Sequence, residues 1–318
     1  MITEKELPEV NNPAEVRVRL LRKFNFRGSV VSYAIVNAQP LLNATINSDM
    51  KRKLEPVEVL DTDSNGVKTR KIAEIARIIC KFTVTRYEDE EKNQVSGDLD
   101  AITEISPAQN LTKLMLVSAA HLKGTWLTKG KYICDKSQTK SNCAKVFHAD
   151  IDPRADIPEG LDDDRIPMTD IRDYYIETKD KFTNGIYEHT YKAPIDLLGV
   201  DKLPITVTKI TVTAPSFATF KRAHMEAKRM MNPGLWMIHD SIININDYSE
   251  EDSKKILAAN SFDAIMSFKD LNDKNDLIEA CNNSAYWSFK DYELQCNNCM
   301  GETISPFDAS THFLYLYK

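Results

Sequence analysis

Four of the six cysteines form two pairs that lie far apart in the chain. Cys296 and Cys299 enclose two asparagines near the C-terminus, and Cys134 and Cys143 lie far upstream with eight residues between them. Apolar and polar residues alternate around both pairs, as they do in half-buried strands. The alternating apolar residues are Tyr132, Val146, Phe147 and Ile151 around the first pair and Tyr292, Leu294, Phe313, Tyr315 and Tyr317 around the second. Each pair is therefore predicted to lie on a β-hairpin.

Two cysteine pairs on two hairpins are typical of a zinc ribbon. Structural zinc prefers four ligands in a tetrahedron, and thiolates are common among them. We therefore expect one Zn²⁺ bound by Cys134, Cys143, Cys296 and Cys299. The upstream spacing is wider than in a common zinc knuckle, so His148 and His312 are alternative ligands.

Disulfides and redox chemistry are the competing interpretations of these cysteines. Residues 1–26 carry charges throughout and lack the apolar stretch of a signal peptide, which argues against an oxidising compartment. A redox Cys-x-x-Cys begins a helix, whereas Met300, Gly301 and Pro306 follow this one. Cys80 and Cys281 lie on apolar faces of predicted helices, where buried core thiols are expected.

Composition excludes several classes of function. The 318 residues include 41 lysines and arginines against 47 acidic residues, for a net charge of -6 without a basic block, so nucleic-acid binding is not expected. No apolar run reaches the roughly 18 residues of a membrane span, and no glycine-rich phosphate loop is present. We expect neither a membrane partner nor a small-molecule substrate.

The periodicity of apolar residues predicts an α+β protein. Helices are expected from Asn12 through residue 24, over residues 68–82, and from Ser106 to about residue 124. Strands are expected over residues 30–36, 205–213 and 242–245, and further helices after Ser216, Ser249 and Ser261. Residues 150–173 form an acidic connector, in which Asp162, Asp163 and Asp164 lack the pattern of a calcium loop.

These elements divide the chain into three regions. Residues 1–125 form a mainly helical N-terminal region, and residues 126–200 hold the first cysteine hairpin and the acidic connector. Residues 201–318 form a strand-helix module with mixed β structure that closes with the Cys-x-x-Cys hairpin. The zinc-ribbon-like module formed by the two hairpins would tie these regions together.

The last third of the chain is similar to a known family. Its segments SIININDYS, EEDSKKILAA, SFDAIMSFKDL and YELQCNNCMGETISPFDASTHFLYLY resemble the tail of the T-even-type bacteriophage baseplate hub family. The resemblance implies a structural protein of a contractile phage tail, in the virion or an assembly intermediate, synthesised in the host cytoplasm. Its partners would be other baseplate proteins in a multi-subunit complex. In the family a glycine usually follows the second cysteine directly, where this chain has Met300.

No catalytic constellation emerges from the sequence, so the chain is not expected to be an enzyme. His121, His189, His224 and His239 are candidate acid-base residues, but no Ser or Cys nucleophile motif accompanies them. The alternative function is a zinc-ribbon adaptor that binds nucleic acid. Residues 111–126 also resemble a core segment of serpins, but the reactive-loop region and closing strand motif of serpins are missing, so chance similarity is the favoured interpretation.

Overall fold

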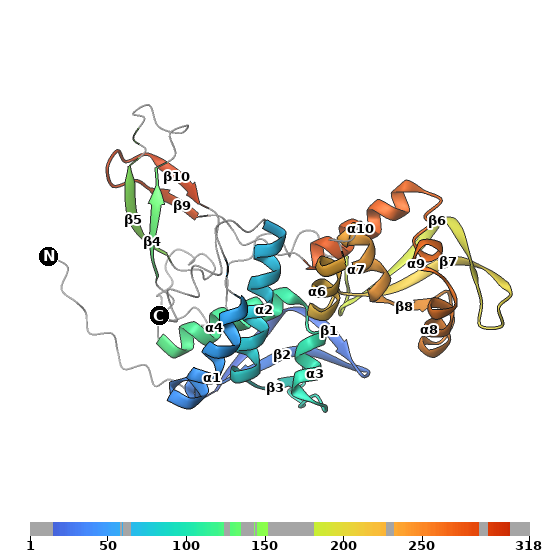
Figure 1. The fold of residues 1–318 in the computed structure, drawn as a ribbon, viewed down its shortest axis with the longest axis horizontal. Coiled ribbons are helices and arrows are strands. Elements are labelled where there is room, and N and C mark those ends of the chain that lie inside the picture. The colour runs from blue at the N-terminus through green and yellow to red at the C-terminus, as the bar shows by residue number, and fades with distance from the viewer. Residues whose placement is uncertain are drawn as a thin grey trace.

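The computed structural model describes residues 15–57, 59, 65–123, 128–134, 143, 145–151, 181–226, 232–285 and 292–305. Over these residues the α+β class is confirmed, because helices pack on two three-stranded antiparallel sheets, and two separate hairpins complete the fold (Figure 1). The expected acidic connector with Asp162, Asp163 and Asp164 lies almost entirely outside the described residues. His312 and the aromatic run from Phe313 also lie outside them.

The first sheet lies in the N-terminal region that was expected to be mainly helical. It contains β1 (Val16–Phe26), β2 (Ser29–Val36) and β3 (Val84–Glu88) in that order. The helix expected from Asn12 is therefore wrong, because every second residue of β1 from residue 18 to residue 26 is buried. That two-residue period is the period of a strand with one face on the core. Gly28, with φ of 86°, forms the turn to β2.

Helices cover the first sheet and confirm two further expectations. They are η1 (Gln39–Leu42), α1 (Ala44–Leu54), η2 (Glu55–Val57), α2 (Asn65–Thr83), α3 (Leu99–Ile105) and α4 (Ala108–Lys123). The helices α2 and α4 are those expected over residues 68–82 and after Ser106. Every residue of α4 from Ala108 to His121 is buried, so α4 is the central helix between β1, β2 and α2.

The second sheet contains β6 (Ile186–Leu198), β7 (Pro204–Thr213) and β8 (Ile242–Ile245) in that order. Its helices are α6 (Phe217–Glu226), α7 (Pro233–Ser241), α8 (Glu250–Ala259), α9 (Phe262–Ile265) and α10 (Leu271–Ala285). The hydroxyls of Ser216 and Ser249 accept hydrogen bonds from backbone N–H groups in the first turns of α6 and α8, as expected. The expected helix from Ser261 is divided into α9 and α10, because Asp270 accepts a hydrogen bond from the Asn272 N–H and begins a new helix.

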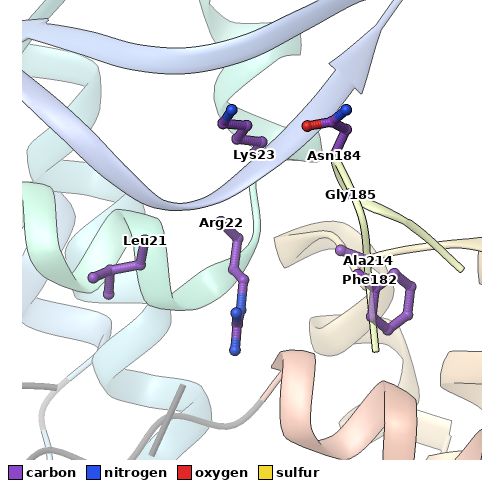
Figure 2. A pocket seen from close by; sticks show the side chains of 7 residues that line it. All are labelled: Leu21, Arg22, Lys23, Phe182, Asn184, Gly185 and Ala214. Carbon is purple, nitrogen blue, oxygen red and sulfur yellow. The ribbon is translucent and has the colours of Figure 1, made fainter. Parts of the chain in front are cut away.

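The two sheets and their helices share one apolar core. The N–H of Phe217 donates to the carbonyl of Ser106 at 2.8 Å and joins α6 to the start of α4. Beside Ala214, the backbone at Gly185 approaches β1 closely, next to a cavity of about 220 Å³ (Figure 2). In Figure 2, Arg22 and Lys23 leave β1 in opposite directions around this cavity.

The remaining strands form two hairpins with a small core of their own. The first hairpin pairs β4 (Thr128–Ile133) with β5 (Val146–Ile151), and the second pairs β9 (Tyr292–Gln295) with β10 (Glu302–Ser305). Figure 1 shows the two hairpins side by side, away from both sheets. No helix in the described part of the chain combines the length and apolar character needed to cross a membrane.

Candidate metal centre

Each hairpin places its two cysteines at the strand ends by the same backbone hydrogen bond. Cys134 follows β4, and its N–H donates to the carbonyl of Lys145 at 3.1 Å. Cys296 follows β9, and its N–H donates to the carbonyl of Gly301 at 2.9 Å. In both hairpins the acceptor is the second residue after the second cysteine, so each turn holds both thiols on the same side.

The structure brings together the four cysteines predicted from the sequence. Their sulfur atoms all lie within 4.8 Å of one another. The Sγ atoms of Cys134 and Cys299 are 3.6 Å apart, and those of Cys143 and Cys296 are 3.9 Å apart. A tetrahedral ion with metal–sulfur bonds of about 2.3 Å requires sulfur–sulfur distances of about 3.8 Å. The four thiols can therefore bind a metal ion with little rearrangement.

Neither competing interpretation fits this geometry. All four cysteines are free thiols, so no disulfide links the pairs. The Cys-x-x-Cys motif lies on a β-turn between β9 and β10 and does not begin a helix, as a redox motif would. His148, the alternative ligand, has an exposed side chain on β5 and does not belong to the four-residue cluster.

The cluster lies in a core that is very small. Its buried members are Cys134, Phe147, Leu294 and Cys296, so two of the four are candidate ligands. The rings of Tyr132 and Phe147, 5.9 Å apart, extend it on the first hairpin. Two-stranded hairpins are marginally stable in water, and a core of this size adds little. The module therefore needs a bound metal, or a partner, for stability of its own.

Burial makes two of the thiols reluctant to ionise. Burial raises the pKa of Cys134 to about 12, and the neighbouring thiols of Cys299 and Cys296 act in the same direction. The backbone N–H of Lys145 favours the thiolate of Cys143, but burial and the same two thiols outweigh it and raise the pKa of Cys143. Both residues are protonated at neutral pH when no metal is bound.

Cys296, in contrast, ionises more readily than an ordinary thiol. Burial opposes its ionisation, but the N–H groups of Asn298 and Cys299 donate to its sulfur and lower its pKa to about 6. The distance from the Asn298 nitrogen to the sulfur is 3.4 Å. Cys296 would thus offer a thiolate to a cation at neutral pH, whereas Cys134 and Cys143 would each release a proton on binding one.

The four candidate acid-base histidines lie at separate places in the fold. His121 is buried in α4, and His239 pairs with Asp240 at 3.0 Å. The ring of His224 contacts that of Phe220 in a tilted arrangement, with a centroid distance of 4.5 Å. His189 on β6 is enclosed, with its Nε2 atom 3.2 Å from a carboxylate oxygen of Asp273 on α10. The other ring nitrogen of His189, Nδ1, lies 3.3 Å from the hydroxyl oxygen of Tyr187.

The remaining cysteines behave as the sequence predicted. Cys80 and Cys281 are fully buried in α2 and α10. Burial raises the pKa of both thiols, to about 12 for Cys281, so they are inert at neutral pH. Sequence reasoning missed Thr303 on β10, whose hydroxyl donates to the Cys134 sulfur, because its neighbour is remote in the chain.

Comparisons of this chain with protein-family models, with curated proteins and with solved structures found no match.

Proposed function

We propose that the protein is a structural component of a bacteriophage tail baseplate hub, or of its assembly intermediate, and that it is stabilised by a bound zinc ion. The observation that supports the structural role most directly is the convergence of four thiols from two remote hairpins. Four protein ligands leave no open position for a substrate, which is typical of a structural site and not of a catalytic one.

Zinc is the proposed ion because of the donor set. Four thiolates at tetrahedral spacing favour zinc over the hard cations calcium and magnesium, which prefer oxygen. In zinc-binding peptides the ion contributes on the order of 10 kcal/mol to folding. A contribution of that size is what a hairpin pair with this small core needs.

The metal-bound module also offers a surface to neighbours. Its described strands and turns expose four large apolar side chains, namely Ile133, Val146, Met300 and Ile304. Ile133 and Val146 lie directly opposite each other on β4 and β5. Exposed apolar residues on a rigid module are typical of proteins that are buried in a larger assembly. We infer that other baseplate proteins contact the module there.

The phage assignment depends on the resemblance of residues 241–317 to the baseplate hub family, and it can be tested in infected cells. We expect the protein in purified tails by mass spectrometry, and we expect a null mutant of its gene to produce no contractile tails. Complementation by Cys296→Ser should fail, whereas complementation by Cys281→Ala, a buried cysteine outside the cluster, should restore tails. Normal infectious particles from the null mutant would exclude the proposed function.

A nucleic-acid adaptor is the second candidate, because the first hairpin exposes Lys131 and His148 directly opposite each other, with Lys145 also exposed just before β5. The expected result for the hub protein is no binding to double-stranded DNA or RNA at physiological salt. Binding that weakens steeply with salt, and that is lost in the Lys131→Ala, Lys145→Ala double variant, would favour the adaptor instead.

A further inference from the structure

The helices and strands from β1 to β5 occur in the same order along the chain as those from β6 to β10. In each half a long antiparallel hairpin leads into helices, and the third strand follows the last of these helices without a break. Thr83 ends α2 directly before β3, and Ser241 ends α7 directly before β8. Further helices follow, and then a hairpin with two cysteines. The strand orders β1-β2-β3 and β6-β7-β8 are equivalent.

The pairing registers of the two sheets coincide in detail. Between β1 and β2, residues 20–23 are opposite Ser32 alone, and between β6 and β7, residues 191–194 are opposite Thr208 alone. The third strands repeat a second irregularity. It falls between Ile35 and Val36 in one sheet and between Thr211 and Val212 in the other, three residues after the first irregularity in each. Bulges are specific features of a fold, and two at matching positions indicate a common plan.

Each bulge is held by the same position of an equivalent helix. The side chain of Asn110, the third residue of α4, accepts from the Arg22 N–H at 2.8 Å. The side chain of Asp273, the third residue of α10, accepts from the Ala193 N–H at 3.2 Å. Arg22 and Ala193 occupy the same place in their bulges, as counted from the last regular pair. Both acceptors are buried, and their contacts span 88 and 80 positions in the chain.

The cysteine hairpins extend the correspondence. The first cysteine of each pair, Cys134 or Cys296, is buried, and the second, Cys143 or Cys299, is partly exposed. The short sulfur–sulfur distances join the first cysteine of one hairpin to the second cysteine of the other, in both combinations. That exchange is what a twofold axis through the centre of the cluster would produce.

We propose that the chain is a tandem duplication of one unit, and that the metal site is a contact between the cysteine hairpins of the two copies. Each unit has a bulged hairpin, a third strand, a clamping helix and a two-cysteine half-site that cannot complete a tetrahedron alone. The ligand is a soft divalent cation shared between half-sites, and the two hairpins are interchangeable in binding it. This inference goes beyond the proposed function, because it holds whatever assembly contains the protein.

Interchangeable hairpins can be tested in the full-length chain. One variant replaces residues 135–142 with Asn-Asn, so that the first hairpin becomes Cys-Asn-Asn-Cys, and the reciprocal variant gives the second hairpin the eight-residue loop. Both variants are expected to bind one zinc per chain, with dissociation constants within about tenfold of the parent chain. Adding Cys134→Ser to either variant should abolish binding. A loop-exchanged variant with unchanged circular dichroism that binds no zinc would overturn the proposal.

The clamps give a second test that does not depend on metal. Asn110→Ala should speed amide hydrogen exchange of Arg22 by roughly tenfold or more and leave Ala193 unchanged, and Asp273→Ala should do the reverse. Asn272→Ala, at an exposed position next to Asp273, is the control. If either clamp variant left its own bulge amide protected, the two units would not be equivalent. A parent chain without zinc but with both clamp effects would contradict the shared metal site and the zinc-stabilised role, and would leave the duplication of the two units supported.

Discussion

The sulfur atoms of Cys134 and Cys299 lie 3.6 Å apart although 165 positions separate the two residues in the chain. Holding these remote thiols close together is unfavourable by itself, because ordering each hairpin loses conformational entropy. A shared metal ion would offset that loss, since it would bind only when both hairpins are in place. The cluster thereby links the two cysteine hairpins as one unit.

Removing a ligand from either hairpin should have the same effect on metal binding. Cys134→Ser and Cys296→Ser each leave three thiols, so both are expected to lower zinc content to the same degree, measured by elemental analysis of purified protein. Cys281→Ala removes a buried thiol that is not in the cluster and should retain full zinc content. Unchanged zinc in the Cys134 variant would mean that the two pairs are not one site.

Metal binding should release protons. Because the pKa values of Cys134 and Cys143 are raised, both thiols lose a proton when they bind the ion, whereas Cys296 is already ionised above pH 6. The logarithm of zinc affinity is expected to rise with pH with a slope of about two or more between pH 6.5 and 8. Competition with a chromophoric chelator measures this slope. A pH-independent affinity would contradict the thiolate assignment.

Met300 occupies a backbone conformation that favours glycine. Its φ is 58°, and left-handed backbone costs a non-glycine residue roughly 1–2 kcal/mol. Met300→Gly should remove this cost, less the larger entropy of glycine in the unfolded chain, for a net gain of up to about 1 kcal/mol. Zinc affinity would then tighten by up to about fivefold in a chelator titration. Asn298→Gly, in the same turn without a positive φ, should give no gain.

Gly185 is required by the close approach of the two halves of the protein. A Cβ atom there would lie 2.5 Å from the Lys23 carbonyl oxygen, and the φ of 79° adds strain. Gly185→Ala is expected to cost at least about 2 kcal/mol in urea unfolding. Gly28→Ala is a matched control, because Gly28 has φ of 86° and no atom within 4 Å of its added Cβ. Equal losses of unfolding free energy in the two variants would show that the close approach of Gly185 to Lys23 does not contribute to stability.

Acid should destabilise the protein through His189. Burial lowers the pKa of His189, although Asp273 partly counteracts it. Near pH 6.5 the unfolded histidine binds a proton that the folded one does not, so stability is lost as the pH falls below about 6.5. His189→Gln cannot titrate, and the decrease in unfolding free energy between pH 7 and pH 5 should be smaller. The control is Asn272→Gln, at an exposed position of α10, which should show the same dependence of unfolding free energy on pH as the parent protein. If His189→Gln also showed that same dependence, His189 would not be the cause of the acid sensitivity.

Local signals were sufficient for several elements and for the site residues. The alternating β-branched residues of β7, the serine caps of α6 and α8, and the paired cysteines each depend on neighbours in the chain. The four thiols were predictable because zinc chemistry requires a fixed number of ligands, and only four cysteines lie in hairpin-like contexts.

Other features depend on contacts that no local pattern encodes. The N-terminal segment has Asn-Pro, a common helix start, yet the alternation that begins at Val18 and the turn at Gly28 make it a strand. The link between His189 and Asp273 spans 84 positions and has no motif. The correspondence between the two halves is expressed in strand register and in the clamps at Asn110 and Asp273, where even the residue types differ.

X-ray absorption at the zinc edge of the purified full-length protein shows whether one metal ion is held by four thiolates from the two hairpins. We predict one zinc per chain with four sulfur neighbours at about 2.3 Å and no nitrogen or oxygen neighbours. Protein that remains metal-free after purification with zinc present, or zinc with fewer than four sulfur neighbours, would contradict the account.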